Sequence, residues 1–364
     1  MRRRGWAVAI AVLAGCRISD LSFYQPGGAG GASDAGSDGI TGAVDAQGTA
    51  DAAAATGPPF PSCEGLQARC GAAAGSCCES LAVPDGTFFR DHDVAGDAMY
   101  GGTTYRATIS SFRLDKYDVT VARFRAFVAA GKGTRVDPPG ADDGAHPHKP
   151  GSGWDPSWTL SLEPTTDLLI ADIKCSVDQT WTDAPVSATD ENRPINCVTW
   201  YEAMAFCIWD GGYLPTEAEW NYAALGGDDQ RAYPWSSPPG ALTIDTSYAS
   251  YSPDGGTTCP EDGMPMCDVG DIVPVGTLAN GEGRWHHADL VGNLSQWVLD
   301  WFEPYPTSCA DCANTVLTGG NPEIRSVRGG SFGAGKDHLR GGLRDNDLPT
   351  RRNYINTIRC ARPL

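Results

Sequence analysis

Twelve cysteines between positions 63 and 360, with a thirteenth at Cys16, constrain this 364-residue chain more than any other feature. So many cysteines are typical of proteins that fold in an oxidising compartment and form disulfides there. The even number after Cys16 allows up to six disulfides, whose pairing the sequence leaves open. We therefore expect an exported protein whose loops are tied by disulfide bonds.

The N-terminus also predicts export. Arg2–Arg4 form a positively charged segment and Gly5–Gly15 an apolar stretch. This pattern is typical of a signal peptide, and the stretch is too short to span a bilayer. Leu13–Cys16 (LAGC) resembles the lipobox of bacterial lipoproteins, which implies removal of residues 1–15 and lipidation of Cys16. The implied location is extracytoplasmic, with the chain anchored in the bacterial outer membrane or at the cell surface. The alternative is an ordinary signal peptide followed by an incidental cysteine.

A low-complexity segment follows the N-terminus. Pro26–Pro59 consists almost entirely of Gly, Ala, Ser, Asp and Thr. Such a segment cannot bury enough apolar surface to offset the entropy that folding removes. We interpret residues 16–62 as a lipidated cysteine with a disordered tether, and residues 63–82 as a Cys-rich lead-in to the domain. The cysteine spacing of the lead-in lacks the paired ligands of a zinc site and favours disulfides.

The remaining residues, 83–364, predict an α+β domain with long irregular loops and little regular secondary structure. Threonine caps and glycine stops predict three helices, at Val121–Ala130, Trp200–Trp209 and Glu217–Leu225. Capping boxes open the second and third helices, because a glutamate follows each cap threonine by three residues. Short strands are expected at Ala107–Leu114, Ser326–Ser331 and Asn356–Cys360.

Seven segments, taken together and in this order, resemble the formylglycine-generating enzyme family, or sulfatase-modifying factor domain. They are VPDGTF at 83–88, FRLDKYDVT at 112–120, PINCVTW at 194–200, LPTEAEWNYAA at 214–224, GNLSQWVLDW at 292–301, RGGSF at 328–332 and IRCA at 358–361. LPTEAEW is the most specific of them, and its residues have structural roles as caps and packing groups. The resemblance implies the family fold, which is a loop-rich relative of the C-type lectin fold.

The chemistry of the family depends on a pair of cysteines. Members that make formylglycine oxidise a substrate cysteine with oxygen and a copper ion held by two thiolates, which are soft ligands suited to Cu(I). The corresponding stretch here, residues 333–344, contains no cysteine, and Lys336 and Gly341 fall at the two positions. Copper is therefore not expected. The candidates for altered chemistry in the same pocket, or for a solvated loop, are Lys336, Asp337, His338 and Arg340.

The resemblance further implies a calcium ion with oxygen ligands, the donors that a hard cation prefers. The matching groups are the side chains of Asp289 and Gln296 and the carbonyl oxygens of Gly292 and Leu294. This chain has Gln296 where the family has a glutamate, and Asp289 could restore the charge. The alternative is that these residues only complete a turn.

Three other pairs could bind metal or exchange electrons. His146-x-His148 and His286-His287 have metal-binding side chains but no carboxylate at a suitable spacing. Cys309-x-x-Cys312 lies in a proline-containing loop outside any βαβ unit, which favours a structural disulfide over redox exchange.

Two functions from different classes remain open. The first is a non-catalytic, lipid-anchored binding or assembly module that holds a peptide, protein or glycan. The second is an enzyme, either a protein-modifying oxidoreductase of the formylglycine-generating type or one of altered chemistry in the same pocket. The missing thiol pair favours the first. A net charge of −18 argues against a nucleic-acid partner, because binding phosphates requires a basic face, and it favours basic or calcium-bridged partners.

Overall fold

The computed structural model describes residues 60–66, 68–256, 258–259, 264, 266–318 and 323–364. The predicted signal peptide, Cys16 and nearly all of the tether lie outside these residues. Residues Ala55–Leu364 cluster as one compact unit. In the described part of the chain, no helix has both the length and the apolar character needed to cross a bilayer.

The predicted boundary of the tether needs a small correction. Residues 60–62 were expected to be part of it, but Pro61–Cys63 form a 3-10 turn, η1, in which Ser62 is buried. The Ser62 backbone N–H donates to Asp210 Oδ1 at 3.0 Å, and its hydroxyl accepts from Arg123 Nε at 2.9 Å. Because these partners are distant in the chain, nothing local in the sequence indicates that the ordered domain includes Ser62.

The three predicted helices are confirmed almost to the residue. They are α1 (Val121–Ala129), α4 (Trp200–Trp209) and α5 (Glu217–Ala224). Both predicted capping boxes are present, in α4 between Thr199 and Glu202 and in α5 between Thr216 and Glu219. Two shorter helices, which the sequence analysis did not predict, are α2 (Thr166–Asp172) and α3 (Ala188–Glu191).

The described strands form four small sheets. Their orders are β1–β2, β10–β9–β7–β11, β12–β6–β3 and β4–β5–β8. The bounds are β1 Arg69–Cys70, β2 Gly75–Ser76, β3 Ser80–Val83, β4 Gly86–Phe89, β5 Arg106–Ile109, β6 Phe112–Asp115, β7 Ser295–Trp301, β8 Ser308–Ala310, β9 Arg325–Arg328, β10 Asp345–Asp347, β11 Asn356–Thr357 and β12 Ala361–Pro363. This mixture of short strands, short helices and long loops confirms the α+β, loop-rich prediction.

The predicted strands are present but shorter than expected. The stretch Ala107–Leu114 is two strands, β5 and β6, which belong to different sheets and are separated by Ser110 and Ser111. The strand expected at Ser326–Ser331 ends at Arg328, because Gly329 and Gly330 have φ values of 103° and 67° and turn the chain away from the sheet.

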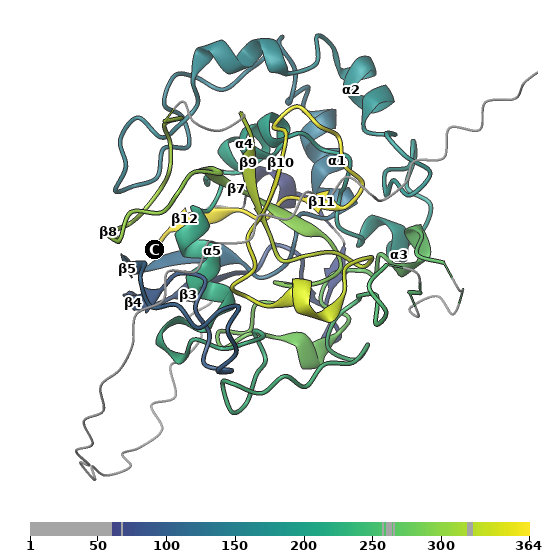
Figure 1. Ribbon diagram of the computed structural model, residues 1–364. Helices are drawn as coiled ribbons and strands as arrows, with labels where there is room; N and C mark the ends of the chain where they lie inside the picture. Colours follow the sequence, from purple (N-terminus) through teal and green to yellow (C-terminus); the bar gives the residue numbers. More distant parts are fainter. Residues whose placement is uncertain (1–59, 67, 257, 260–263, 265, 319–322) are drawn as a thin grey trace, which may run out of the picture. The chain divides into compact units, whose positions relative to one another are not determined.

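The main core lies between α1, α4 and the sheet that contains β7. Every residue of β7 is buried, and α4 packs against it on one side and against α1 on the other. Figure 1 shows these elements together, with α2 in an outer loop. The Cys207–Cys360 disulfide ties α4 to the segment between β11 and β12. The C-terminal part of the chain is thereby fixed to the centre of the domain.

Candidate functional site

The stretch expected to hold chemistry forms the 3-10 turn η6, Lys336–Leu339. Lys336 and Asp337 are exposed and His338 is half-buried. Arg340 is buried, and its guanidinium pairs with two carboxylates, Asp93 through Nε at 3.0 Å and Asp97 through Nη1 at 2.8 Å. These ion pairs hold Arg340 in place, and none of the four candidate side chains lines either of two pockets, of about 220 and 330 Å³, in the described residues.

Glycine backbones pack closely beside this stretch. The Ser252 N–H donates to the Ala334 carbonyl at 2.9 Å. A Cβ added at Gly335 would lie 3.3 Å from the Gly255 Cα atom, which is tighter than ordinary van der Waals contact. Residues 252–256 therefore cover this side of the stretch with main chain and leave little room for a side chain between the two segments.

The described residues offer no free pair of thiolates for a copper ion. The twelve cysteines from Cys63 to Cys360 form six disulfides, as the even count predicted. The lead-in cysteines and the Cys309-x-x-Cys312 pair are among them, as the sequence analysis favoured. The described residues also contain no group of three or more His, Cys, Asp or Glu side chains arranged to hold a metal. The residues present thus do not fit the family's two-thiolate copper site.

The Gln296 side chain does not fit the expected calcium site either. Its Oε1 atom accepts from Trp220 Nε1 at 2.7 Å and from Arg359 Nε at 2.9 Å, and its Nε2 atom donates to the Asp289 carbonyl at 2.9 Å. An oxygen that accepts from a guanidinium is not available to a cation. Asp289 is buried and accepts from the Gly276 N–H at 2.6 Å, and burial raises its pKa. Gly292 and Leu294 are buried in the turn before β7.

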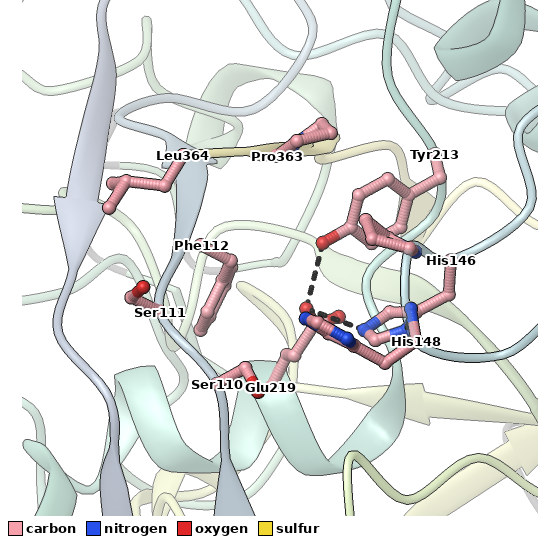
Figure 2. Close-up of a pocket in the computed structure, with 10 residues that line it drawn as sticks. Ser110, Ser111, Phe112, His146, His148, Tyr213, Glu219, Pro363 and Leu364 are labelled. Atoms are coloured by element: carbon pink, nitrogen blue, oxygen red, sulfur yellow. Dashed lines mark hydrogen bonds and ion pairs between the residues drawn. The ribbon is translucent and has the colours of Figure 1, made fainter.

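A pocket of about 220 Å³ lies elsewhere, where four segments distant in the sequence meet (Figure 2). The turn between β5 and β6, a loop after α1, the start of α5 and the end of β12 all contribute. The lining residues are Ser110, Ser111, Phe112, His146, Pro147, His148, Tyr213, Glu219, Pro363 and Leu364. The sequence analysis treated Glu219 only as a helix cap and did not single out Tyr213.

Three buried side chains meet at the floor of this pocket. One Glu219 oxygen, Oε1, accepts from the Tyr213 hydroxyl at 2.8 Å and lies 3.1 Å from His146 Nε2. The other, Oε2, accepts from the Thr216 N–H at 2.8 Å, which is the capping-box bond. The cap that starts α5 therefore also orients Glu219 toward His146 and Tyr213.

The hydrogen bonds of His146 define its tautomer. Its Nδ1 atom accepts from the His148 backbone N–H at 3.1 Å, so the proton of the neutral ring is on Nε2 and is donated to Glu219. Neither nitrogen has a free lone pair for a metal. The pair His146-x-His148 is thus not arranged as a chelate, although the two rings are 5.8 Å apart.

The pKa of each group follows from burial and from Glu219. Burial lowers the pKa of His146, but the hydrogen bond and charge of Glu219 outweigh it and the net shift is upward. Burial, with the nearby Glu219 charge, raises the pKa of Tyr213, so its hydroxyl stays protonated. The two residues of the second histidine pair lie in different environments. His286 is exposed beside Glu282, whereas His287 is buried, and burial lowers its pKa to about 3.

The comparisons with known proteins agree with this architecture. The model of the sulfatase-modifying factor enzyme 1-like domain matches residues 67–364. A formylglycine-generating enzyme from Thermomonospora curvata is 30% identical over 275 residues, which cover 69% of this chain and 82% of the relative. A hercynine oxygenase from Mycolicibacterium thermoresistibile is 27% identical over 264 residues, covering 70% of this chain but only 51% of that relative.

A solved structure gives the same result for the fold. PvdO from Pseudomonas aeruginosa superimposes with a TM-score of 0.50 at 20% sequence identity, covering 79% of this chain and 95% of PvdO. Because the family model spans most of the described domain and the first of these relatives is matched over most of its length, this chain belongs to the sulfatase-modifying factor (formylglycine-generating enzyme-like) family.

Proposed function

We propose that this chain is a lipid-anchored, extracytoplasmic member of the family that acts as a binding or assembly module and lacks the copper-dependent cysteine oxidase activity. The observation that carries the proposal is the state of the cysteines. All twelve from Cys63 to Cys360 are in disulfides, and no thiol is available in the stretch 333–344. Soft thiolate ligands are what Cu(I) requires.

The surroundings of the stretch also support a non-catalytic role. Arg340, which stood among the catalytic candidates, is held by Asp93 and Asp97, and Lys336 and Asp337 face solvent. A pocket for chemistry needs side chains that converge on a reacting atom. The partner is proposed to be a peptide, protein or glycan, with the membrane reached through Cys16.

An enzyme of altered chemistry is the alternative. The relatives named above include a formylglycine-generating enzyme and a hercynine oxygenase, so proteins similar to this chain carry different activities. Fold alone does not fix function. The alternative would need a reacting group other than a thiol.

Copper binding and oxygen consumption test the proposal. The full chain is incubated with Cu(I) and with a cysteine-containing sulfatase peptide, and bound metal, oxygen uptake and the mass of the peptide are measured. We expect no stoichiometric copper and no loss of the peptide thiol. Stoichiometric copper together with conversion of the cysteine would overturn the proposal and assign the chain to the oxidases.

A further inference from the structure

The pocket beside His146 carries a negative charge that no arginine or lysine of the described residues pairs with. Other buried carboxylates of the domain pair with guanidinium groups, as Asp210 does with Arg123 and Glu202 does with Arg352. Among the described residues, Glu219 has an ion-pair contact with His146 alone. The His148 N–H donates to His146 Nδ1, which defines the neutral Nε2–H tautomer, and in this state the imidazole leaves the charge of Glu219 uncancelled.

A second carboxylate lies behind the wall of the pocket. Asp311 accepts from the Ser110 N–H at 2.7 Å and from the Ser110 hydroxyl at 2.9 Å. Its charge acts on both His146 and Tyr213. Lys149 lies near enough for its charge to act on His146, but it does not line the pocket. The pocket therefore has a negative potential.

The rim is apolar where the floor is polar. Phe112, Pro147, Pro363 and Leu364 line the pocket together with the polar groups, so an aliphatic stem would contact apolar surface while its head reached the hydroxyls and Glu219. Figure 2 shows Tyr213, His146 and Glu219 converging on one side and Phe112 facing them. A charged head that leaves water at such a floor needs an opposite charge and hydrogen-bond partners there, while its aliphatic stem buries apolar surface at the rim.

We propose that this pocket binds a primary ammonium group on a short aliphatic stem. The inference goes beyond the binding role proposed above, because none of the residues at 333–344 lines the pocket and the copper experiment does not depend on it. Glu219 supplies the charge, and the Tyr213 hydroxyl oxygen beside it supplies an acceptor. The two sources of such a group are a free amine and a lysine side chain.

Protonation of His146 should compete with the ligand. An imidazolium would neutralise Glu219 and repel an ammonium, and its added proton on Nδ1 would break the bond from the His148 N–H. The charged and titratable groups that face His146 are Glu219, Tyr213, His148, Asp311 and Lys149. Of these, Glu219 dominates and favours the protonated ring at acidic pH. Affinity should therefore fall as the pH is lowered.

The test is an NMR titration of the full chain that follows the backbone amide of His148. The probes are n-butylammonium chloride, the neutral isostere n-butanol and Nα-acetyl-lysine amide, at pH 7.5 and 5.5. We expect saturable shifts with butylammonium, binding about tenfold weaker with butanol, which corresponds to about 1.4 kcal/mol, and weaker binding at pH 5.5. Comparable shifts with Nα-acetyl-lysine amide would assign a lysine side chain, and their absence would assign a free amine.

Two variants test the charge of Glu219 and the protonation of His146 without removing the capping box of α5. Glu219→Gln keeps the capping box, which glutamine also completes, and should lose about tenfold in butylammonium affinity. His146→Gln retains a donor for Glu219 and should bind equally at both pH values. Equal binding of butanol and butylammonium would overturn the proposal. So would undiminished binding by Glu219→Gln, or no saturation below about 100 mM, a concentration at which the binding free energy would be only about 1.4 kcal/mol.

Discussion

The guanidinium carbon of Arg325 lies 3.4 Å from the ring centroid of Trp301 and 3.6 Å from that of Trp200, so the cation is stacked between two indole rings. Its Nη1 donates to the Leu299 carbonyl at 2.7 Å, whereas Nε and Nη2 have no hydrogen-bond partner within the described part of the chain. Burial lowers the pKa of Arg325 to about 9. The aromatic rings thus only partly compensate the loss of hydration, and the volume of the side chain matters as much as its charge.

Substitutions of Arg325 separate these two contributions. Arg325→Ala should lower the free energy of unfolding by about 3 kcal/mol, because it leaves a void between two rings. Arg325→Met should stay within about 1 kcal/mol of the parent, since it fills the space and removes a buried charge without a carboxylate partner. Urea denaturation checks both. Equal losses in the two variants would indicate that the cation–π contact, and not the volume, stabilises the core.

A substitution in the buried charge cluster around Asp210 should lower the free energy of unfolding far more than a substitution in an exposed ion pair. Asp210 accepts from Arg123 Nη2 at 2.5 Å and from Arg362 Nη2 at 2.6 Å, and all three side chains are buried. Asp210→Asn leaves two guanidinium groups with less compensation and should cost about 3–5 kcal/mol. The control is Asp183→Asn, which removes the exposed partner of Lys174 and should cost less than about 1 kcal/mol. Similar losses of unfolding free energy in Asp210→Asn and Asp183→Asn would contradict the expected difference between the buried cluster and the exposed pair.

Features that depend on residues close together in the sequence were predicted accurately, whereas features that depend on contacts between distant residues were not. α4 and α5 were predicted closely because their caps and their stopping residues lie within a few positions of one another. The pairing of β3 with β6 and of β6 with β12 was not predicted, because each strand is only three or four residues long and its partner lies up to 251 positions away. The register of such short strands depends on tertiary packing.

The pocket could not be predicted from the sequence for the same reason. Glu219 was correctly identified as a cap, but its second role depends on His146, which is 73 positions away. Arg340 was a pocket candidate because the family resemblance puts residues 333–344 at the pocket, and its ion-pair partners Asp93 and Asp97 lie more than 240 positions away. The even number of cysteines, in contrast, needed no knowledge of the fold to predict up to six disulfides.

The six disulfides should differ in their effect on stability. Cys207–Cys360 joins residues 153 positions apart, whereas Cys309–Cys312 joins residues 3 positions apart. Because a cross-link restricts the unfolded chain more when the loop is longer, Cys207→Ala/Cys360→Ala should cost about 4–5 kcal/mol. The matched pair Cys309→Ala/Cys312→Ala should cost less than half of that. Chemical denaturation under non-reducing conditions measures both, and a larger loss from the short loop would refute this order.

His287 should make the domain sensitive to acid. Its pKa is about 3 in the folded protein and about 6.5 in an unfolded chain, so between these values only the unfolded chain binds the proton. The contribution of His287 to the free energy of unfolding is fully present above pH 6.5. It is lost as the pH falls toward 3, by about 1.4 kcal/mol per pH unit. His287→Gln should reduce the slope between pH 4 and 6 by that amount.

The exposed neighbour provides the control for this measurement. His286→Gln removes the neighbouring imidazole, whose side chain is 76% exposed, and should change the slope less than His287→Gln does. Asp118, whose pKa burial raises to about 8, contributes an opposite slope in every variant, so the comparison uses the difference between His287→Gln and the parent. Identical slopes in the two proteins would show that His287 does not carry the acid sensitivity.

Gln296 should make this domain independent of calcium. Its amide oxygen accepts from Trp220 and Arg359, and its Nε2 donates to the carbonyls of Asp289 and Leu290, so hydrogen bonds hold this turn. EDTA should therefore shift the melting temperature by less than about 1 °C, a change below about 1 kcal/mol for a domain of this size. Gln296→Glu places a carboxylate against two carbonyl oxygens and should cost about 2–3 kcal/mol without metal. Added calcium should restore part of that loss in the variant but not change the parent, and elemental analysis should find no stoichiometric calcium in the parent. A parent protein that melts much earlier in EDTA would contradict this prediction and would return Asp289, Gly292 and Leu294 to the position of calcium ligands.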